Sequence, residues 1–197
     1  MATKRCATSL DRSFPHPLKF HSRGKRWTAA LALMVTGLAF AQTPDSAGRG
    51  AYAGFAEPDQ AFVIEAAANS NLEVYMSRVA ALRANANAVR SFALSTAEDH
   101  SKARRKLKEI ALSRDVRITD RLDDKRADIL MTLQRYAGDE FDREYLTQQV
   151  DLHRRAVRLF QEQAQRSGNN ELRSFAESKL AVLEAQLRTA QALADSR

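Results

Sequence analysis

Four ionisable side chains fall on the apolar faces of predicted helices, where a charged or polar group must find a partner. They are Glu73, His100, Asp142 and His153. At about 100° per residue, Asp142 and His153 lie near the middle of a wide apolar arc, and Glu73 lies within the apolar stripe of its own helix. His100 lies at the edge of a stripe. Two imidazoles with a carboxylate suit zinc, iron, copper or manganese, so these residues are candidate ligands of a divalent transition metal.

The four long helices of the predicted bundle can bring inward polar side chains to one depth. In a bundle of helices of similar length the midpoints are level, and a polar layer is then expected to form from Glu73, His100, His153 and Gln186. Asp99, Tyr145 and Gln186 are expected around the metal ligands. Burying such groups unpaired costs several kcal/mol, so they should bind one another, water or an ion. The alternative to a metal site is a hydrogen-bonded network that sets the helix register.

The chain beyond Pro58 has the composition of continuous helix. It contains no further proline and only two glycines, Gly138 and Gly168, and it is rich in Ala, Leu, Arg, Gln and Glu. Asp59 is expected to cap the first helix and Asp139 the fourth. The predicted helices cover about 59–83, 87–113, 123–136, 139–166 and 170–194.

The lengths of the connections predict the topology. The first two long helices are joined by a few residues, as are the last two, so each pair should form an antiparallel hairpin. About 25 residues, including a short helix, join the two pairs. This pattern predicts an all-α, ferritin-like four-helix bundle with one long crossover carrying a short extra helix. The alternative is a fully antiparallel bundle with the 123–136 helix as a lid.

The N-terminus has the pattern of a secretory signal peptide. Arg23, Lys25 and Arg26 precede an uncharged apolar run over 27–40, and Ala39-Phe40-Ala41 is a small-x-small cleavage site. The run is shorter than the roughly 20 residues of a membrane-spanning helix, although an uncleaved signal anchor is the alternative. We therefore expect a signal peptide over 1–41, a flexible tether over 42–58 and a helical domain over 59–194, in an exported, periplasmic protein.

Removal of residues 1–41 changes the chemistry open to the chain. The formal charge of +7 falls to +1, because seven of the basic residues and one acid lie in that segment. Nucleic-acid binding needs a surplus of cations on one surface and is not expected. Cys6, the single cysteine, leaves as well, which excludes disulfides and thiolate ligands from the mature protein.

The segment 98–109 is strongly basic, but its charges fall outside the apolar arc of the helix. Glu98 precedes Lys102 by four residues and Arg105 precedes Glu109 by four, spacings that favour surface ion pairs. The basic residues therefore indicate a solvated helix face. The alternative is a docking face for an acidic partner or an anionic lipid.

Several segments, 60–82, 89–107, 138–164 and 171–187, resemble the bacterial domain-of-unknown-function family 4142, whose members are often labelled predicted outer-membrane or ferritin-like proteins. The resemblance covers about 60–194. The family has an inward Glu on the first helix, Asp-His on the second, and Phe-Asp-x-x-x-Tyr leading to a His on the next long helix. These motifs match Glu73, Asp99-His100, Phe141-Asp142 with Tyr145, and His153.

The resemblance implies a ferritin-like fold and export, and brings no established activity. Where the family usually has a histidine on the last helix, this chain has Gln186, a poorer ligand than imidazole, which implies an altered site. Di-iron chemistry of the ferritin type is not expected, because the chain has no Glu-x-x-His.

These observations predict an exported helical-bundle protein that is not an enzyme, since no Ser-His-Asp or paired-carboxylate spacing is singled out. Its expected role is to bind an envelope protein or a small ligand, in a stress-related context, without a transmembrane span in the mature chain. The alternative is a metal-binding protein with a redox or metal-storage role at the polar layer.

Overall fold

The computed structural model describes residues 54–196, which contain five helices and belong to one compact unit. The predicted signal peptide and most of the predicted tether lie outside the described residues. None of the described helices is long and apolar enough to cross a membrane. The helices are α1 (Glu57–Arg83), α2 (Asn87–Leu112), α3 (Asp124–Leu133), α4 (Gly138–Arg166) and α5 (Asn170–Asp195).

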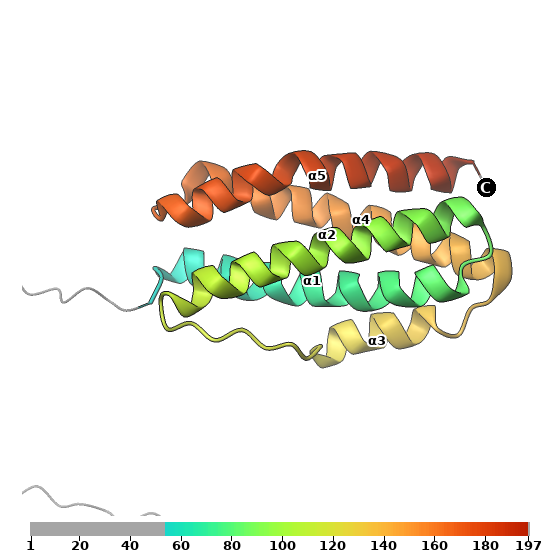
Figure 1. The fold of residues 1–197 in the computed structure, drawn as a ribbon, viewed down its shortest axis with the longest axis horizontal. Helices are drawn as coiled ribbons and strands as arrows, with labels where there is room; N and C mark the ends of the chain where they lie inside the picture. The colour runs from blue at the N-terminus through green and yellow to red at the C-terminus, as the bar shows by residue number, and fades with distance from the viewer. Residues whose placement is uncertain (1–53, 197) are drawn as a thin grey trace, which may run out of the picture. The chain divides into compact units, whose positions relative to one another are not determined.

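Four of these helices form a bundle with ferritin-like connectivity (Figure 1). α1 and α2 form one antiparallel hairpin, and α4 and α5 form the other. The segment 113–137, which contains α3, runs back along the bundle, so that α4 begins next to the loop between α1 and α2. α2 and α4 therefore run in the same direction, which confirms the predicted fold class and excludes the fully antiparallel alternative.

Two helix ends differ from the prediction. Asp59 is not an N-cap: it lies inside α1, is buried, and accepts hydrogen bonds from Gln163 Nε2 and Ser167 Oγ, each at 2.8 Å. α4 begins at Gly138, whose φ of 58° lies in the left-handed region that glycine adopts without strain. Asp139 therefore follows in the first turn and does not cap the helix.

Arg126 holds the short helix of the crossover against the bundle. Its guanidinium donates to Glu65 Oε1 at 2.6 Å and to Asn69 Oδ1 at 2.8 Å, both on α1. Leu133 is the buried residue of α3 and packs into the core. Asn71 Nδ2 also donates to the backbone oxygen of Thr119 at 2.9 Å, and Arg83 donates to the backbone oxygens of Gln134 and Tyr136, so polar contacts hold the crossover to α1 along its length.

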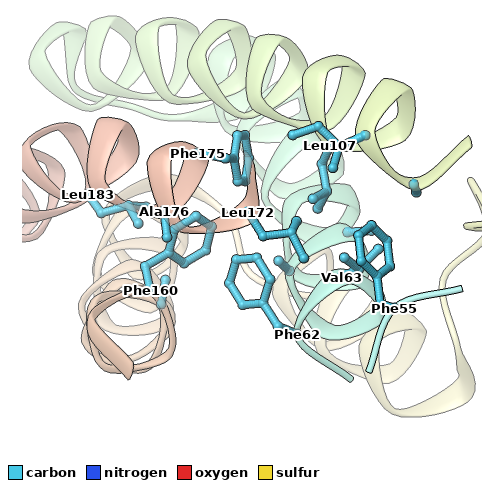
Figure 2. Close-up of a cluster of buried hydrophobic side chains, with 14 residues drawn as sticks. Phe55, Phe62, Val63, Leu107, Phe160, Leu172, Phe175, Ala176 and Leu183 are labelled. Carbon is cyan, nitrogen blue, oxygen red and sulfur yellow. The ribbon is translucent and has the colours of Figure 1, made fainter. Parts of the chain in front are cut away.

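The apolar core is divided into two clusters along the bundle axis. The cluster near the start of α1 is built from aromatic and aliphatic side chains, among them Phe62 and Phe160, which Figure 2 shows. Their rings are 5.1 Å apart in an edge-to-face arrangement. The second cluster includes Leu72, Met76, Phe92, Phe141 and Leu146. The buried ionisable residues of the polar layer belong to neither cluster.

Candidate metal centre

Three of the four candidate ligands come together in the middle of the bundle. Glu73 on α1, His100 on α2 and His153 on α4 are only 3%, 7% and 0% exposed. Each offers one ligand atom, and these atoms all lie within 4.8 Å of one another. His100 thus points inward, and the imidazole rings of His100 and His153 meet edge-to-face with their centroids 5.6 Å apart.

Asp142, the fourth candidate, is not brought to this cluster. It shares a face of α4 with His153, but it lies three turns away, about 16 Å along the helix axis. Its two carboxylate oxygens accept the backbone N–H groups of Asn85 and Ala86, each at 2.9 Å. Asp142 therefore holds the start of α2 to α4 and satisfies N–H groups that the helix itself leaves free.

Hydrogen bonds orient Glu73 and His153 from one neighbouring residue. The side-chain amide of Gln149 donates to Glu73 Oε2 at 2.6 Å, while its backbone carbonyl oxygen lies 2.9 Å from His153 Nδ1. His153 Nδ1 is also 3.7 Å from Glu73 Oε1. Gln149 therefore sets the orientation of two candidate ligands at once.

His153 contacts a hydrogen-bonding group at each ring nitrogen. Its Nδ1 faces a carbonyl oxygen, which only accepts, so Nδ1 carries a hydrogen. Its Nε2 lies 3.1 Å from Gln186 Oε1, and the Gln186 amide donates to Asp99 Oδ2 at 3.1 Å. His153 thus lies in one chain of hydrogen-bonding contacts that runs from Gln149 through Gln186 to Asp99.

Burial has the largest effect on the pKa of Glu73. Removal from water raises the pKa of the carboxyl, and the neighbouring His153 and the Gln149 hydrogen bond oppose the rise. Tyr145 lies near the same carboxylate, and its hydroxyl forms a hydrogen bond with Ser77 Oγ at 2.9 Å. Burial and the proximity of Glu73 raise the pKa of Tyr145, which keeps the phenol protonated.

His100 has no hydrogen-bond partner at either ring nitrogen among the described residues. Burial, the charge of His153 and the charge of Lys179 lower the pKa of His100 to about 3. The ring is therefore neutral at pH 7 and has one N–H and one free lone pair. Buried polar atoms normally have a partner, so this imidazole indicates a group that the protein alone does not supply.

Two further buried atoms lack a partner, Thr96 Oγ and Gln149 Oε1. Within residues 54–196, the buried side-chain atoms without a partner thus come from three residues, all in or one turn from the polar layer. The sequence analysis did not predict a polar role for Thr96 or for Ser77. Each of these residues carries a hydroxyl group and lies one helical turn from an inward ionisable residue, Thr96 from His100 and Ser77 from Glu73. That spacing was the signal available in the sequence.

The donor set fits a divalent transition metal. Two imidazoles and one carboxylate are the three protein ligands of many zinc sites that keep a fourth position open. The Nδ1–H of His153 bonds to a backbone carbonyl, the arrangement that commonly fixes the ring of a ligating histidine. A ferritin-type di-iron centre does not fit, because the clustered residues supply one carboxylate.

The basic face of α2 is largely neutralised by neighbouring acids. Lys102 pairs with Glu98 at 2.6 Å as expected, and Arg104 pairs with Asp120 at 2.7 Å. Lys106 approaches Glu109 at 3.7 Å, in place of the expected pair of Glu109 with Arg105. These contacts favour the solvated helix face over a docking surface for an anionic partner.

The lowered pKa of His100 predicts how metal-free protein responds to acid. Its folded-state pKa of about 3 lies below the unfolded value of 6.5. The neutral ring therefore contributes stability above pH 6.5 that is lost as the pH falls toward 3, by up to about 1.4 kcal/mol per pH unit. The raised pKa of Glu73 acts in the opposite direction: its contribution is full below pH 4.5 and is lost as the pH rises.

The measurement is urea unfolding, followed by circular dichroism between pH 7.5 and 4.5 with a chelator present. A His100→Leu variant should lose less stability than the wild type over this range, because it lacks the group that must protonate on unfolding. The wild-type-minus-variant difference removes the contribution of Glu73 and of other shared groups. Parallel pH profiles for the two proteins would contradict the assignment.

Comparison with known proteins gives a family and a fold. The family described as "Domain of unknown function (DUF4142)" matches residues 44–193. No curated protein matches the chain. Among solved structures, the crystal structure of a DUF305 fragment from Deinococcus radiodurans is similar, with a TM-score of 0.65 and 13% identity. The match covers 73% of this chain and 99% of that fragment and supports the helical fold alone.

Proposed function

We propose that this chain, which belongs to the DUF4142 family, is an exported, non-catalytic binding protein of the cell envelope whose ligand is a divalent transition-metal ion. Glu73, His100 and His153 are its proposed ligands. The observation that carries the proposal is His100, which is buried without a partner at either nitrogen and lies beside a second imidazole and a carboxylate.

A neighbouring residue would hold two of the proposed ligands in a fixed orientation for the ion. The backbone carbonyl of Gln149 orients the ring of His153, and its amide orients the Glu73 carboxylate. Imidazole coordinates a metal only when it is neutral, so binding should weaken as the pH falls. When bound, the ion would supply positive charge to a buried carboxylate whose desolvation is otherwise unfavourable.

Metal buffering or storage suits these residues better than redox catalysis. The centre lacks the second carboxylate cluster of a di-iron site, and the chain offers no thiolate within the domain. Export is supported by the basic flank, the apolar run over 27–40 and the Ala39-Phe40-Ala41 site. A stress-related role in the envelope, in which excess metal is bound, is consistent with both features.

The proposal predicts near-stoichiometric metal in the purified protein. The full 197-residue sequence should be expressed without a tag in a bacterium with a periplasm, purified without chelator, and subjected to elemental analysis and intact-mass measurement. We expect close to one zinc, copper, iron or manganese per chain, and an N-terminus near Gln42.

The matched variants are a His100→Leu/His153→Leu double variant and Asp142→Asn. The double variant should retain the fold and lose the metal, whereas Asp142→Asn should keep it, because Asp142 lies outside the cluster. A folded, metal-free wild type that takes up none of these ions on dialysis would disprove metal binding and leave a structural network. The mass measurement tests export separately.

A further inference from the structure

Gln186 lies on the buried face of α5, beside the three clustered ligands. It falls between Leu183 and Ala190 in the inward stripe of the helix and is only 7% exposed. Its Oε1 lies 3.1 Å from His153 Nε2, and its side chain lines one small pocket together with His100. The Gln186 amide is therefore next to both imidazoles of the proposed centre.

Asp99 determines which end of the Gln186 amide faces the centre. A carboxylate oxygen only accepts hydrogen bonds, and Asp99 Oδ2 lies 3.1 Å from Gln186 Nε2. The amide N–H group therefore faces Asp99 on α2, and the carbonyl oxygen Oε1 faces His153. The oxygen is the end of an amide that can bind a cation.

The neutral form of His153, which is the form that coordinates metal, leaves two acceptor atoms facing each other. Its Nδ1 lies 2.9 Å from the Gln149 backbone oxygen, so the hydrogen of the neutral ring is on Nδ1 and the lone pair is on Nε2. That lone pair faces Gln186 Oε1. A cation bound to both atoms satisfies both of them.

We propose, on the basis of the metal centre proposed above, that Gln186 Oε1 is its fourth ligand, beside two imidazoles and one carboxylate. Ligand bonds of about 2.0–2.2 Å in a tetrahedral zinc site place neighbouring ligand atoms about 3.3–3.5 Å apart. The 3.1 Å between His153 Nε2 and Gln186 Oε1 is close to that separation. Asp99 is a positioning residue, because it acts on the ion only through the Gln186 amide.

A fourth protein ligand closes the coordination sphere. Zinc sites with four protein ligands are structural, whereas catalytic sites keep one position for water or substrate. The centre then holds its ion without an open position, as a binding protein requires and an enzyme does not.

The first test probes the coordination sphere with cobalt(II) in place of zinc, in the purified protein freed of metal. Four protein ligands should give the strong visible absorption of tetrahedral cobalt, and sodium azide should not change it. Gln186→Leu opens one position, so azide should alter the spectrum of that variant saturably. An equal azide response in the wild type and in the variant would overturn the inference.

Zinc affinity, measured by competition with a chromophoric chelator, separates a ligand from a residue that only supports the fold. Gln186→Leu should weaken zinc binding by about tenfold or more, the loss that even an outer partner of a ligand commonly causes. Gln186→Glu should bind zinc at least as tightly as the wild type, because it keeps an oxygen at that position and adds charge.

A purely structural Gln186 predicts a different result for the glutamate variant. Both variants lose the N–H donor to Asp99, so a structural role would weaken zinc binding in both. Equal weakening in Gln186→Leu and Gln186→Glu would therefore refute the fourth ligand. Circular dichroism establishes that each variant is folded before its titration.

The matched controls are Gln191→Leu and Asp99→Leu. Gln191 lies elsewhere on α5 and lines a separate surface pocket, so its loss should leave the zinc affinity and the cobalt spectrum unchanged. Asp99→Leu frees the Gln186 amide to turn and should weaken zinc binding about 10–100-fold. An unchanged affinity in Asp99→Leu would refute the positioning role of Asp99.

The wild-type protein separates the fourth ligand from the centre itself. Wild-type protein that takes up neither zinc nor cobalt would refute the proposed function and the fourth ligand with it. Zinc bound with unchanged affinity by Gln186→Leu would refute the fourth ligand alone and leave the centre of Glu73, His100 and His153 in place.

Discussion

Replacing His153 with leucine should lower the free energy of unfolding of the metal-free protein by about 3 kcal/mol, the usual cost of leaving a buried charge unpaired. The substitution removes the imidazole whose Nδ1 lies 3.7 Å from Glu73 Oε1 and leaves that carboxyl group with the hydrogen bond from the Gln149 amide. Urea unfolding at pH 7 with a chelator measures this loss. In a domain of this size it corresponds to a fall of about 10 °C in the melting temperature.

The second half of this prediction is a rescue. A Glu73→Leu/His153→Leu double variant removes both charges and should regain most of the lost stability, because buried ion pairs are often replaceable by apolar residues of similar volume. A double-mutant cycle with the two single variants isolates the coupling. If the two single losses simply add, Glu73 and His153 are not an ion pair in the folded protein.

Zinc should stabilise the wild-type protein by about 2.7 kcal/mol when its free concentration is one hundred times its Kd. The ion binds residues that are clustered in the native state alone, so it shifts the folding equilibrium toward that state. The melting temperature should rise by about 8 °C with zinc and should return to the metal-free value with chelator. Differential scanning calorimetry at pH 7 measures both.

The variants of this experiment separate the buried centre from adventitious surface binding. Glu73→Gln keeps a polar side chain of the same shape and should lose most of the zinc-dependent rise. Asp142→Asn should be less stable than the wild type at the outset but show the full rise. An equal rise in the His100→Leu/His153→Leu double variant would show that zinc binds elsewhere and would refute the centre.

Much of this architecture follows from the amino-acid sequence by itself. The absence of proline after Pro58 and the apolar periodicity predict long helices, because both are properties of a local segment. Two short connections around one long crossover specify the ferritin-like order, since a few residues can only join antiparallel neighbours. The same periodicity places Glu73 and His153 on inward faces and His100 at the edge of one, and level midpoints predict that the three residues meet.

Only the tertiary structure decided which inward polar residues share the centre. Asp142 and His153 lie on one face of α4, and periodicity cannot distinguish them, because it specifies direction around a helix and not the partner opposite. Packing of α4 against the α1–α2 loop gives Asp142 two backbone N–H groups to bind. Within residues 54–196, the assembled bundle gives the ring nitrogens of His100 no hydrogen-bond partner. Hydrogen-bond satisfaction depends on atoms distant in the chain, so it was decided by the assembled bundle.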